Sequence, residues 1–234
     1  METAIAFEHT SKYYGNTLAA TDVTLSLYNS RIVELIGLNG SGKTTLLKLA
    51  AGLIKPDEGS VEIIGSKAGT KTKRLVSFLS DRHFLASDSS ALQLMKLYSD
   101  FYDDFDKRKA LESLSDLSID INKKLVLMSN GMKRKVELAL VLARETPIYL
   151  LDEPFKELDS AAIDYVKMLI EKKHDASLVV IASGNSSKLE NFADDVLWLQ
   201  NGTVRAYESY KSFVEKAGKG LDEFFREVYK CSES

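Results

Sequence analysis

Cysteine and proline are scarce in this sequence. Its 234 residues include one cysteine, Cys231, and three prolines. A single thiol cannot close a disulfide within the chain, so there is no disulfide framework and the sequence fits a reducing cytosol. No partner base is evident around Cys231, and we interpret this residue as incidental rather than catalytic.

Long apolar runs are absent as well. No stretch approaches the ~18–20 apolar residues that a helix needs to cross a bilayer. Residues 1–10 lack the basic start and the apolar core of a signal peptide. We therefore expect a cytoplasmic protein that does not itself enter the membrane.

Charge of one sign is not in excess. The chain has 31 lysines and arginines against 34 aspartates and glutamates, a formal net charge of -3. The lack of a basic excess argues against a nucleic-acid-binding protein. Hydrophobic residues make up 44% of the chain, which fits a packed core. The length suffices for one large α/β domain or two small ones.

Strand-like and helix-like segments alternate along the chain, which predicts a mixed α/β fold. Apolar residues recur at helical spacing through 89–144, so this segment should be largely helical. Asn201-Gly202 is a strong turn signal and predicts a hairpin. The expected strands are 3–7, 23–28, 31–37, 60–64, 74–79, 148–151, 178–182, 196–199 and 203–206. Further helices are expected at 44–53, at 160–173 with Asp159 or Ser160 as its cap, and as two short helices from residue 208.

The segment from Gly37 to Thr44 has the form G-x-x-x-x-G-K-T and lies between an expected strand and an expected helix. This context is what a phosphate-binding loop requires. Its glycines let the backbone direct N–H groups toward phosphate oxygens. Lys43 brings a positive charge to the β- and γ-phosphates, and Thr44 offers a hydroxyl to Mg²⁺. We predict binding of ATP and Mg²⁺ through Asn39, Gly40, Ser41, Gly42, Lys43, Thr44 and Thr45.

The apolar segment 148–151 ends in two carboxylates, Asp152 and Glu153. A strand here buries its side chains and delivers both acids at its carboxyl end, where α/β sheets bind ligands. Beside a phosphate loop, Asp152 is expected to support Mg²⁺. Glu153 is placed to polarise the attacking water as a general base.

These motifs resemble those of the ABC ATPase family, and the resemblance extends over residues 3–207. The matching segments are Leu150 to Pro154 with Leu158-Asp159 for the Walker B strand and the D-loop, Met128-Ser129-Asn130-Gly131-Met132 for the signature motif, Tyr14 for the residue that stacks on adenine, and Asn201-Gly202 for a late hairpin. The signature motif of the family is usually Leu-Ser-Gly-Gly-Gln and precedes a helix, as is expected here.

The resemblance implies an α/β fold with a P-loop NTPase (RecA-like) core, an antiparallel β subdomain and an inserted helical subdomain. Residues 1–80 and 147–207 would form the core with the β subdomain. Residues 82–146 would form the helical subdomain with the signature motif, and residues 208–234 the C-terminal helices. All of these belong to one ABC ATPase domain, 1–234.

The resemblance also implies an ATPase that works with partners. Two such domains meet head to tail and enclose two ATP molecules, so Ser129 and Gly131 would contact the γ-phosphate held by a second ABC ATPase subunit, identical or homologous. Closure on ATP and opening after hydrolysis would drive a separate transmembrane permease, which places the protein at the inner face of the cell membrane. Residues 101–106 and 131–133 look most like bacterial exporters of the ABC-2 type.

The sequence departs from the family pattern in four features, one of which is a pair of residues. Asp81 stands where the γ-phosphate sensing loop usually holds glutamine, and its carboxylate can still bind Mg²⁺. Met132 replaces the final glutamine of the signature motif, and Lys156-Glu157 replaces a pair of small residues in the D-loop. Asn185 stands in place of the switch histidine; it can hydrogen-bond a phosphate oxygen but cannot carry a charge.

These departures leave more than one function open. With Asn185 beside Lys43 and Glu153 as the catalytic residues, we expect slow hydrolysis by a transporter ATPase. A second hypothesis is a regulatory subunit that closes on ATP, hardly cleaves it and pairs with an active homologue. A third is a non-transport ABC protein that acts on nucleic acid or ribosomes, against which the acidic balance and the single cassette argue.

Two charged segments each have two interpretations. Residues 100–106 mix acids with aromatics; they line a groove for the permease or, as we favour, form a link between helices. Residues 133–135 are basic; they hold phosphate across the dimer or form a solvated helix face. We interpret His9, His83 and His174 as surface or loop residues rather than switch residues.

Overall fold

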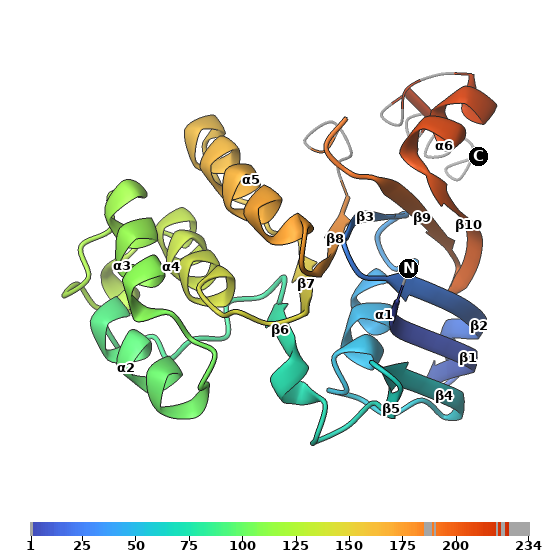
Figure 1. Cartoon of the computed structure of the whole chain (residues 1–234), viewed down its shortest axis with the longest axis horizontal. Coiled ribbons are helices and arrows are strands. Elements are labelled where there is room, and N and C mark those ends of the chain that lie inside the picture. Colours follow the sequence, from blue (N-terminus) through green and yellow to red (C-terminus); the bar gives the residue numbers. More distant parts are fainter. Residues whose placement is uncertain (1, 185–188, 190, 219, 221–222, 225–234) are drawn as a thin grey trace.

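The computed structural model describes residues 2–184, 189, 191–218, 220 and 223–224. Two β-sheets stand side by side in one half of the molecule, and a group of helices forms its other end (Figure 1). Within the described part of the chain, every helix is too short or too polar to cross a lipid bilayer.

The larger sheet has six strands in the order β10-β9-β3-β8-β7-β6. Its strands are β3 (Arg31–Ile36), β6 (Val76–Leu79), β7 (Ile148–Asp152), β8 (Leu178–Ser183), β9 (Asp195–Gln200) and β10 (Thr203–Ser209). All run parallel except β10, which pairs antiparallel with β9. The parallel strands bring their carboxyl ends to one edge of the sheet, and the loops that carry the site begin at this edge.

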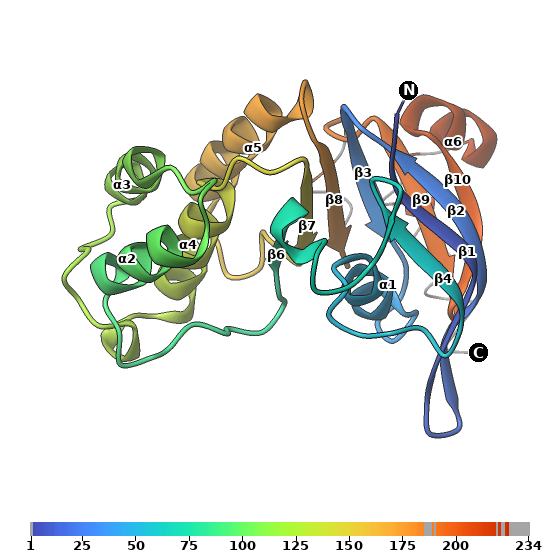
Figure 2. The same cartoon turned by 60° about the horizontal axis from the view of Figure 1, so that its bottom comes forward.

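The smaller sheet is antiparallel, with the order β2-β1-β4-β5. Its strands are β1 (Thr3–Tyr14), β2 (Thr17–Tyr28), β4 (Glu58–Ile63) and β5 (Ser66–Lys67). The helix α1 (Lys43–Ala50) lies between the two sheets (Figure 2). Buried leucines of α1 share one apolar cluster with both sheets, so the helix and the loop before it are held from two sides.

The opposite face of the larger sheet is covered by α5 (Ser160–His174). Residues of β7 alternate between the two faces, as the period of a strand requires. Leu150 belongs to the cluster around α1, whereas Tyr149 and Leu151 pack with Val166 and Ile170 of α5. This two-sided burial explains why the segment before the two carboxylates is apolar throughout.

Three helices separate β6 from β7 in the sequence and pack together at one end of the molecule (Figure 1). They are α2 (Ala91–Phe101), α3 (Lys107–Asp116) and α4 (Asn130–Leu142). Side chains cap each of them: Ser90, Asp106 and Ser129 accept hydrogen bonds from backbone N–H groups of the first turn. The helices share an apolar cluster of their own, which makes this a separate layer of the fold.

Arg144 joins this helical layer to the larger sheet. Its buried guanidinium donates to the carbonyls of Val76 (2.8 Å) and Arg74 (2.7 Å) and makes two hydrogen bonds to the Asp104 carboxylate (2.9 and 2.8 Å). The guanidinium also lies 3.9 Å from the centroid of the Tyr102 ring. Part of the segment 100–106 is therefore a structural link between helices.

Several elements differ in extent from those expected. β1 continues as far as Tyr14, and β2 begins as early as Thr17. Both are longer than predicted because register shifts interrupt the alternation on which the shorter prediction was based. α1 ends at Ala50, and Gly52 follows with a φ of 63°. β10 continues to Ser209, so α6 (Tyr210–Ala217) begins after it, and Asp159 rather than Ser160 caps α5. Cys231 lies outside the described residues.

Candidate functional site

The phosphate loop connects β3 to α1 and is fixed by close backbone contacts. Gly42 precedes α1 with a φ of 105°, and a Cβ atom there would lie 2.2 Å from the carbonyl oxygen of Ala19 in β2. A Cβ at Gly37 would lie 2.3 Å from the carbonyl oxygen of Leu199. Only glycine fits at these two positions without moving the backbone of a neighbouring strand.

Lys43 is the buried cation of the loop. Its ammonium donates to the carbonyl oxygens of Gly37 (2.6 Å) and Leu38 (3.0 Å). Burial lowers the pKa of Lys43, and the nearby carboxylates of Glu153 and Asp152 oppose this shift. The charge is thus held inside the curve of the loop, where phosphate oxygens would be stronger acceptors than the two carbonyls.

Thr44 and Asp152 meet across the site. The Thr44 hydroxyl donates to the Asp152 carboxylate over 2.7 Å and joins the start of α1 to the carboxyl end of β7. Burial raises the pKa of Asp152, the Thr44 hydrogen bond lowers it, and the charge of Asp81 raises it further. A hydroxyl and two carboxylates that face one cavity are the oxygen ligands that Mg²⁺ prefers, so the donor set fits this ion.

Glu153 follows β7 directly, in a left-handed conformation with a φ of 52°. Its carboxylate accepts a hydrogen bond of 2.7 Å from the backbone N–H of Gly184, at the end of β8. Burial raises the pKa of Glu153, whereas the Gly184 hydrogen bond and the charge of Lys43 lower it. A raised pKa strengthens a carboxylate as a base, which suits this residue to accept a proton from water.

One cavity of about 210 Å³ brings most of the predicted site residues together. It is lined by Ala19, Asn39, Gly40, Gly42, Lys43, Thr44, Thr45, Asp81, Asp152 and Glu153. Sequence reasoning missed Ala19, because an alanine carries no chemical signal and β2 is far from the loop in sequence. Ser41 belongs to the same loop but is buried and does not line the cavity.

Of the remaining predicted residues that the structure describes, Tyr14, Ser129 and Gly131 do not line this cavity. Tyr14 ends β1 with half of its surface exposed, and the Lys12 ammonium lies 5.9 Å from the centroid of its ring. Ser129 caps α4, and a Cβ on Gly131 would lie 2.6 Å from the carbonyl oxygen of Glu157. Asn185 lies outside the described residues.

Both interpretations of the basic segment 133–135 are wrong for its central residue. Arg134 is 1% exposed and donates to the carbonyl oxygens of Ser80, over 2.7 Å, and Asp81. Arg134 shares the buried face of α4 with Glu137, Leu138 and Val141, because residues three and four apart lie on one face of a helix. Lys135 pairs with Asp159 at 2.9 Å. Arg134 therefore positions the loop after β6 and is not free to hold a phosphate.

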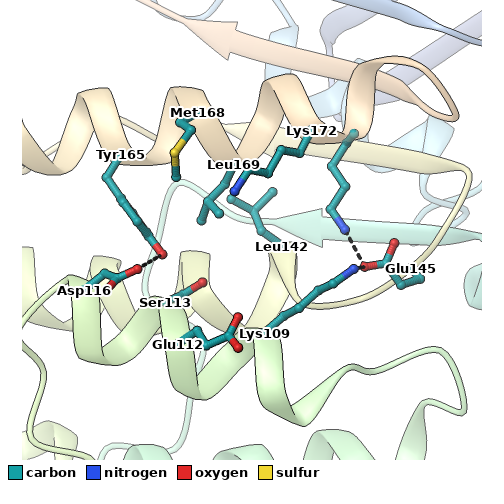
Figure 3. A pocket seen from close by; sticks show the side chains of 11 residues that line it. Lys109, Glu112, Ser113, Asp116, Leu142, Glu145, Tyr165, Met168, Leu169 and Lys172 are labelled. Atoms are coloured by element: carbon teal, nitrogen blue, oxygen red, sulfur yellow. Dashed lines mark hydrogen bonds and ion pairs between the residues drawn. The ribbon is translucent and has the colours of Figure 1, made fainter.

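A second cavity, of about 230 Å³, lies between α3 and α5 (Figure 3). Several of its charged side chains are paired within the chain: Glu145 accepts from Lys109 (2.6 Å) and Lys173 (2.8 Å), and the Tyr165 hydroxyl donates to Asp116 (2.8 Å). Among the predicted site residues that the structure describes, none lines this cavity. The pairs tie α3 and α5 together, which is a structural role.

A third, apolar hollow of about 390 Å³ lies on α2 and the segment before it. Its lining residues are Phe84, Leu85, Ala86, Leu94, Leu97, Tyr98, Phe101 and Tyr102. Phe84 and Leu97 are each 47% exposed and Phe101 is 75% exposed. Large apolar side chains gathered on the surface mark interaction sites.

The fold and the first cavity define a P-loop nucleotide-binding protein. The family model described as ABC transporter matches residues 20–156. The chain is 26% identical over 226 residues to an uncharacterized ABC transporter ATP-binding protein of Methanocaldococcus jannaschii, covering 92% of this chain and 81% of that protein. It is 33% identical over 207 residues to the thiamine import ATP-binding protein ThiQ of Chelativorans sp., covering 84% and 83%.

Solved structures agree with these relatives. An ATP-binding subunit of an ABC transporter superposes with a TM-score of 0.88 at 26% identity, over 97% of this chain and 100% of that one. A dimeric ATP-binding cassette in a post-hydrolysis state, bound to ADP and Pi, superposes with a TM-score of 0.79 at 26% identity, over 88% and 98%.

This chain therefore belongs to the ABC transporter family. The expected fold class, a P-loop NTPase with an added antiparallel sheet and inserted helices, is confirmed. The protein is an ABC-type ATPase that uses ATP and Mg²⁺.

The stability of the folded chain should depend on pH through Glu145, in the charge cluster of the second cavity. Burial alone would raise the pKa of Glu145, but the hydrogen bonds from Lys109 and Lys173 outweigh it and lower the pKa below the ordinary value of 4.5. A depressed carboxyl pKa stabilises the folded state above 4.5, and this contribution is lost as the pH falls through the folded-state pKa.

We therefore expect Glu145→Gln to lower the free energy of unfolding by about 0.5–1 kcal/mol at neutral pH, a value reduced by partial exposure. Below the folded-state pKa the variant and the natural protein should be equally stable. Urea unfolding at neutral pH and at a pH below the folded-state pKa of Glu145 measures the difference in the free energy of unfolding between the variant and the natural protein. Glu112→Gln, in the same cavity, is the control and should cost less at neutral pH, since its pair with Arg108 is long (3.6 Å) and exposed. A loss for Glu145→Gln that is equal at both pH values contradicts the prediction.

Proposed function

We propose that this chain hydrolyses ATP to drive a separate transmembrane permease. The observation that carries the proposal is the Thr44–Asp152 hydrogen bond at 2.7 Å, which sets the two expected Mg²⁺ ligands side by side in the cavity that also holds Lys43 and Glu153. A phosphate-binding cation, a metal-binding pair and a carboxylate base thus face one space.

In this proposal each side chain has one task. Lys43 binds the β- and γ-phosphates and leaves the two loop carbonyls for these stronger acceptors. Thr44, Asp152 and Asp81 hold Mg²⁺, which when bound supplies positive charge against the phosphates. Glu153 orients the attacking water and accepts its proton, since burial raises its pKa.

A second ABC ATPase subunit completes the site in this proposal. Ser129 and Gly131 stand at the start of α4, outside the cavity of their own chain, so their role would be to contact the ATP held by the partner subunit. The dimeric cassette bound to ADP and Pi supports this arrangement for a related protein. Tyr14, half exposed at the end of β1, would stack on the adenine.

The permease would dock on the apolar hollow formed by α2 and the segment before it. This hollow adjoins the loop after β6 that carries Asp81, because Phe84 lies three residues further along the chain. Movement at the γ-phosphate end of the cavity could thus reach the docked partner. Docking there would hold the protein at the inner face of the cell membrane.

The relatives with named cargoes import sulfate or thiosulfate, thiamine and phosphonates. Of these, the chain spans 60% of the sulfate and thiosulfate protein of Mesostigma viride and 83% of the thiamine protein. Export of the ABC-2 type, which residues 101–106 and 131–133 suggested, therefore stays a prediction from sequence.

Glu153→Gln tests the hydrolytic role. We expect kcat for ATP hydrolysis to fall by ~10²–10⁴-fold, because the amide cannot accept the proton, while ATP binding is retained. Phosphate release and the binding of a fluorescent ATP analogue measure the two properties separately. Lys43→Ala is the complementary variant and should lose binding itself. Glu153→Gln with full turnover would contradict the assignment of Glu153 as the base.

Asn185→Ala tests the expectation of slow hydrolysis. The natural protein should turn over well below about ten per second, a typical enzyme rate. Removal of the amide should lower kcat about tenfold further, since one phosphate hydrogen bond is lost. Steady-state and single-turnover assays of the isolated chain measure both. Rapid turnover that Asn185→Ala leaves unchanged contradicts this expectation. Undetectable single-turnover hydrolysis would instead favour the regulatory subunit.

Phe101→Asp tests the docking surface. A charge in the apolar hollow should abolish co-purification with a multi-span membrane protein, to be sought among the products of neighbouring genes, with ATP binding unchanged. Leu111→Asp, an exposed apolar residue of α3 outside the hollow, is the matched control and should keep the partner. Equal co-purification of both variants would place the permease elsewhere.

A further inference from the structure

Lys156, in the turn after β7, pairs with a residue of the nucleotide cavity. Its ammonium lies 2.8 Å from a carboxylate oxygen of Asp81. The neighbouring Phe155 is 2% exposed and anchors the turn in the apolar cluster between the larger sheet and α5. The lysine is therefore directed at Asp81 by a fixed backbone, although about half of its side chain is exposed.

The backbone of the loop that carries Asp81 is fixed as well. The buried guanidinium of Arg134 donates to the carbonyl oxygens of Ser80 and Asp81 and pairs with Glu137 at 3.2 Å. Both side chains of that pair are 1% exposed, so breaking it would leave a buried charge. The Asp81 carboxylate can consequently change partner only by rotation of its own side chain.

A second contact, between His83 and Glu157, joins the same two segments. The His83 ring lies 3.1 Å from the Glu137 carboxylate and 3.6 Å from the carboxylate of Glu157. Residues 156 and 157 thus each contact one residue of the loop 80–83, Lys156 with Asp81 and Glu157 with His83. The turn also touches α4, since a Cβ on Gly131 would lie 2.6 Å from the Glu157 carbonyl oxygen.

The charges around the cavity show what the Lys156–Asp81 pair does. Three carboxylates, Asp81, Asp152 and Glu153, line the cavity beside one buried cation, Lys43. This set carries an excess of two negative charges, which Lys156 reduces to one. A divalent cation prefers carboxylate oxygens and would cancel the same excess. Lys156 and the metal are therefore both attracted to the Asp81 carboxylate.

We propose that Lys156 competes with Mg²⁺ for the Asp81 carboxylate, and so sets the affinity of the site for the metal. This inference rests on the proposed role of Asp81 as a metal ligand. When Asp81 turns to the metal, the ion pair is broken and the turn at 156–157 loses one of its two contacts with the loop 80–83. The same turn lies against the start of α4, so metal binding is communicated to the signature segment.

The test measures the affinity of the ADP-bound chain for Mn²⁺, a spectroscopic substitute for Mg²⁺, by electron paramagnetic resonance at a concentration where the chain is monomeric. Lys156→Met should bind Mn²⁺ about threefold to fivefold more tightly, the size expected when a partly exposed ion pair no longer competes. Lys156→Arg keeps the charge and should stay close to the natural affinity. Lys96→Met, an exposed lysine of α2 outside the cavity, is the control for loss of one charge.

Asp81→Asn distinguishes the possible failures. It should weaken Mn²⁺ binding and remove the effect of Lys156→Met in the double variant. If Asp81→Asn weakens binding but Lys156→Met has no larger effect than Lys96→Met, the competition is overturned and the ligand role stands. If Asp81→Asn leaves Mn²⁺ binding unchanged, the ligand role and the competition both fail. ADP binding through Lys43, measured in the presence of a chelator, then shows that the nucleotide site itself is intact.

Discussion

The phosphate site depends on the close approach of the loop before α1 to the carboxyl end of β7. The hydrogen bond of 2.7 Å from Thr44 to Asp152 links the two directly. On the other side of the loop, the backbone of Gly42 lies so near the Ala19 carbonyl that no Cβ could be placed between them. Burial of α1 between two sheets holds both contacts at once, because the helix cannot move toward one sheet without leaving the other.

Two buried arginines hold the helical layer to this core in a similar way. Arg144 donates to the carbonyl of Val76, the first residue of β6, and Arg134 donates to the carbonyls of Ser80 and Asp81, just past its end. The planar guanidinium has five donors and can satisfy several fixed acceptors, which an ammonium group on a flexible stem does less well. β6 is therefore held at both ends, and the loop that carries Asp81 must follow any shift of α4.

The sequence predicted the features that depend on the type and order of neighbouring residues. The phosphate loop, the apolar strand before Asp152 and the alternation of strands and helices could all be read from residue type and order. The full length of β1 could not, because its bulges break the two-residue period. Arg134 was missed for a related reason: a basic run at a helix start looks like a solvated face, and only the packed helix shows that its middle residue points inward.

Departures from the family that look independent in sequence are coupled in space. A carboxylate at position 81, beside Asp152 and Glu153, adds repulsion that a neutral glutamine would avoid, and Lys156 supplies the charge that offsets it. The bulk of Lys156 and Glu157 is accommodated by Asp81 and His83 of the same chain. Met132 likewise packs against the apolar cluster of the helical layer. Each of these substituted residues contacts other residues of the same chain. The contacts account for the substitutions without a loss of ATPase activity. The hypothesis of a regulatory subunit then rests on Asn185, whose amide would have to do the work of a residue that can carry charge.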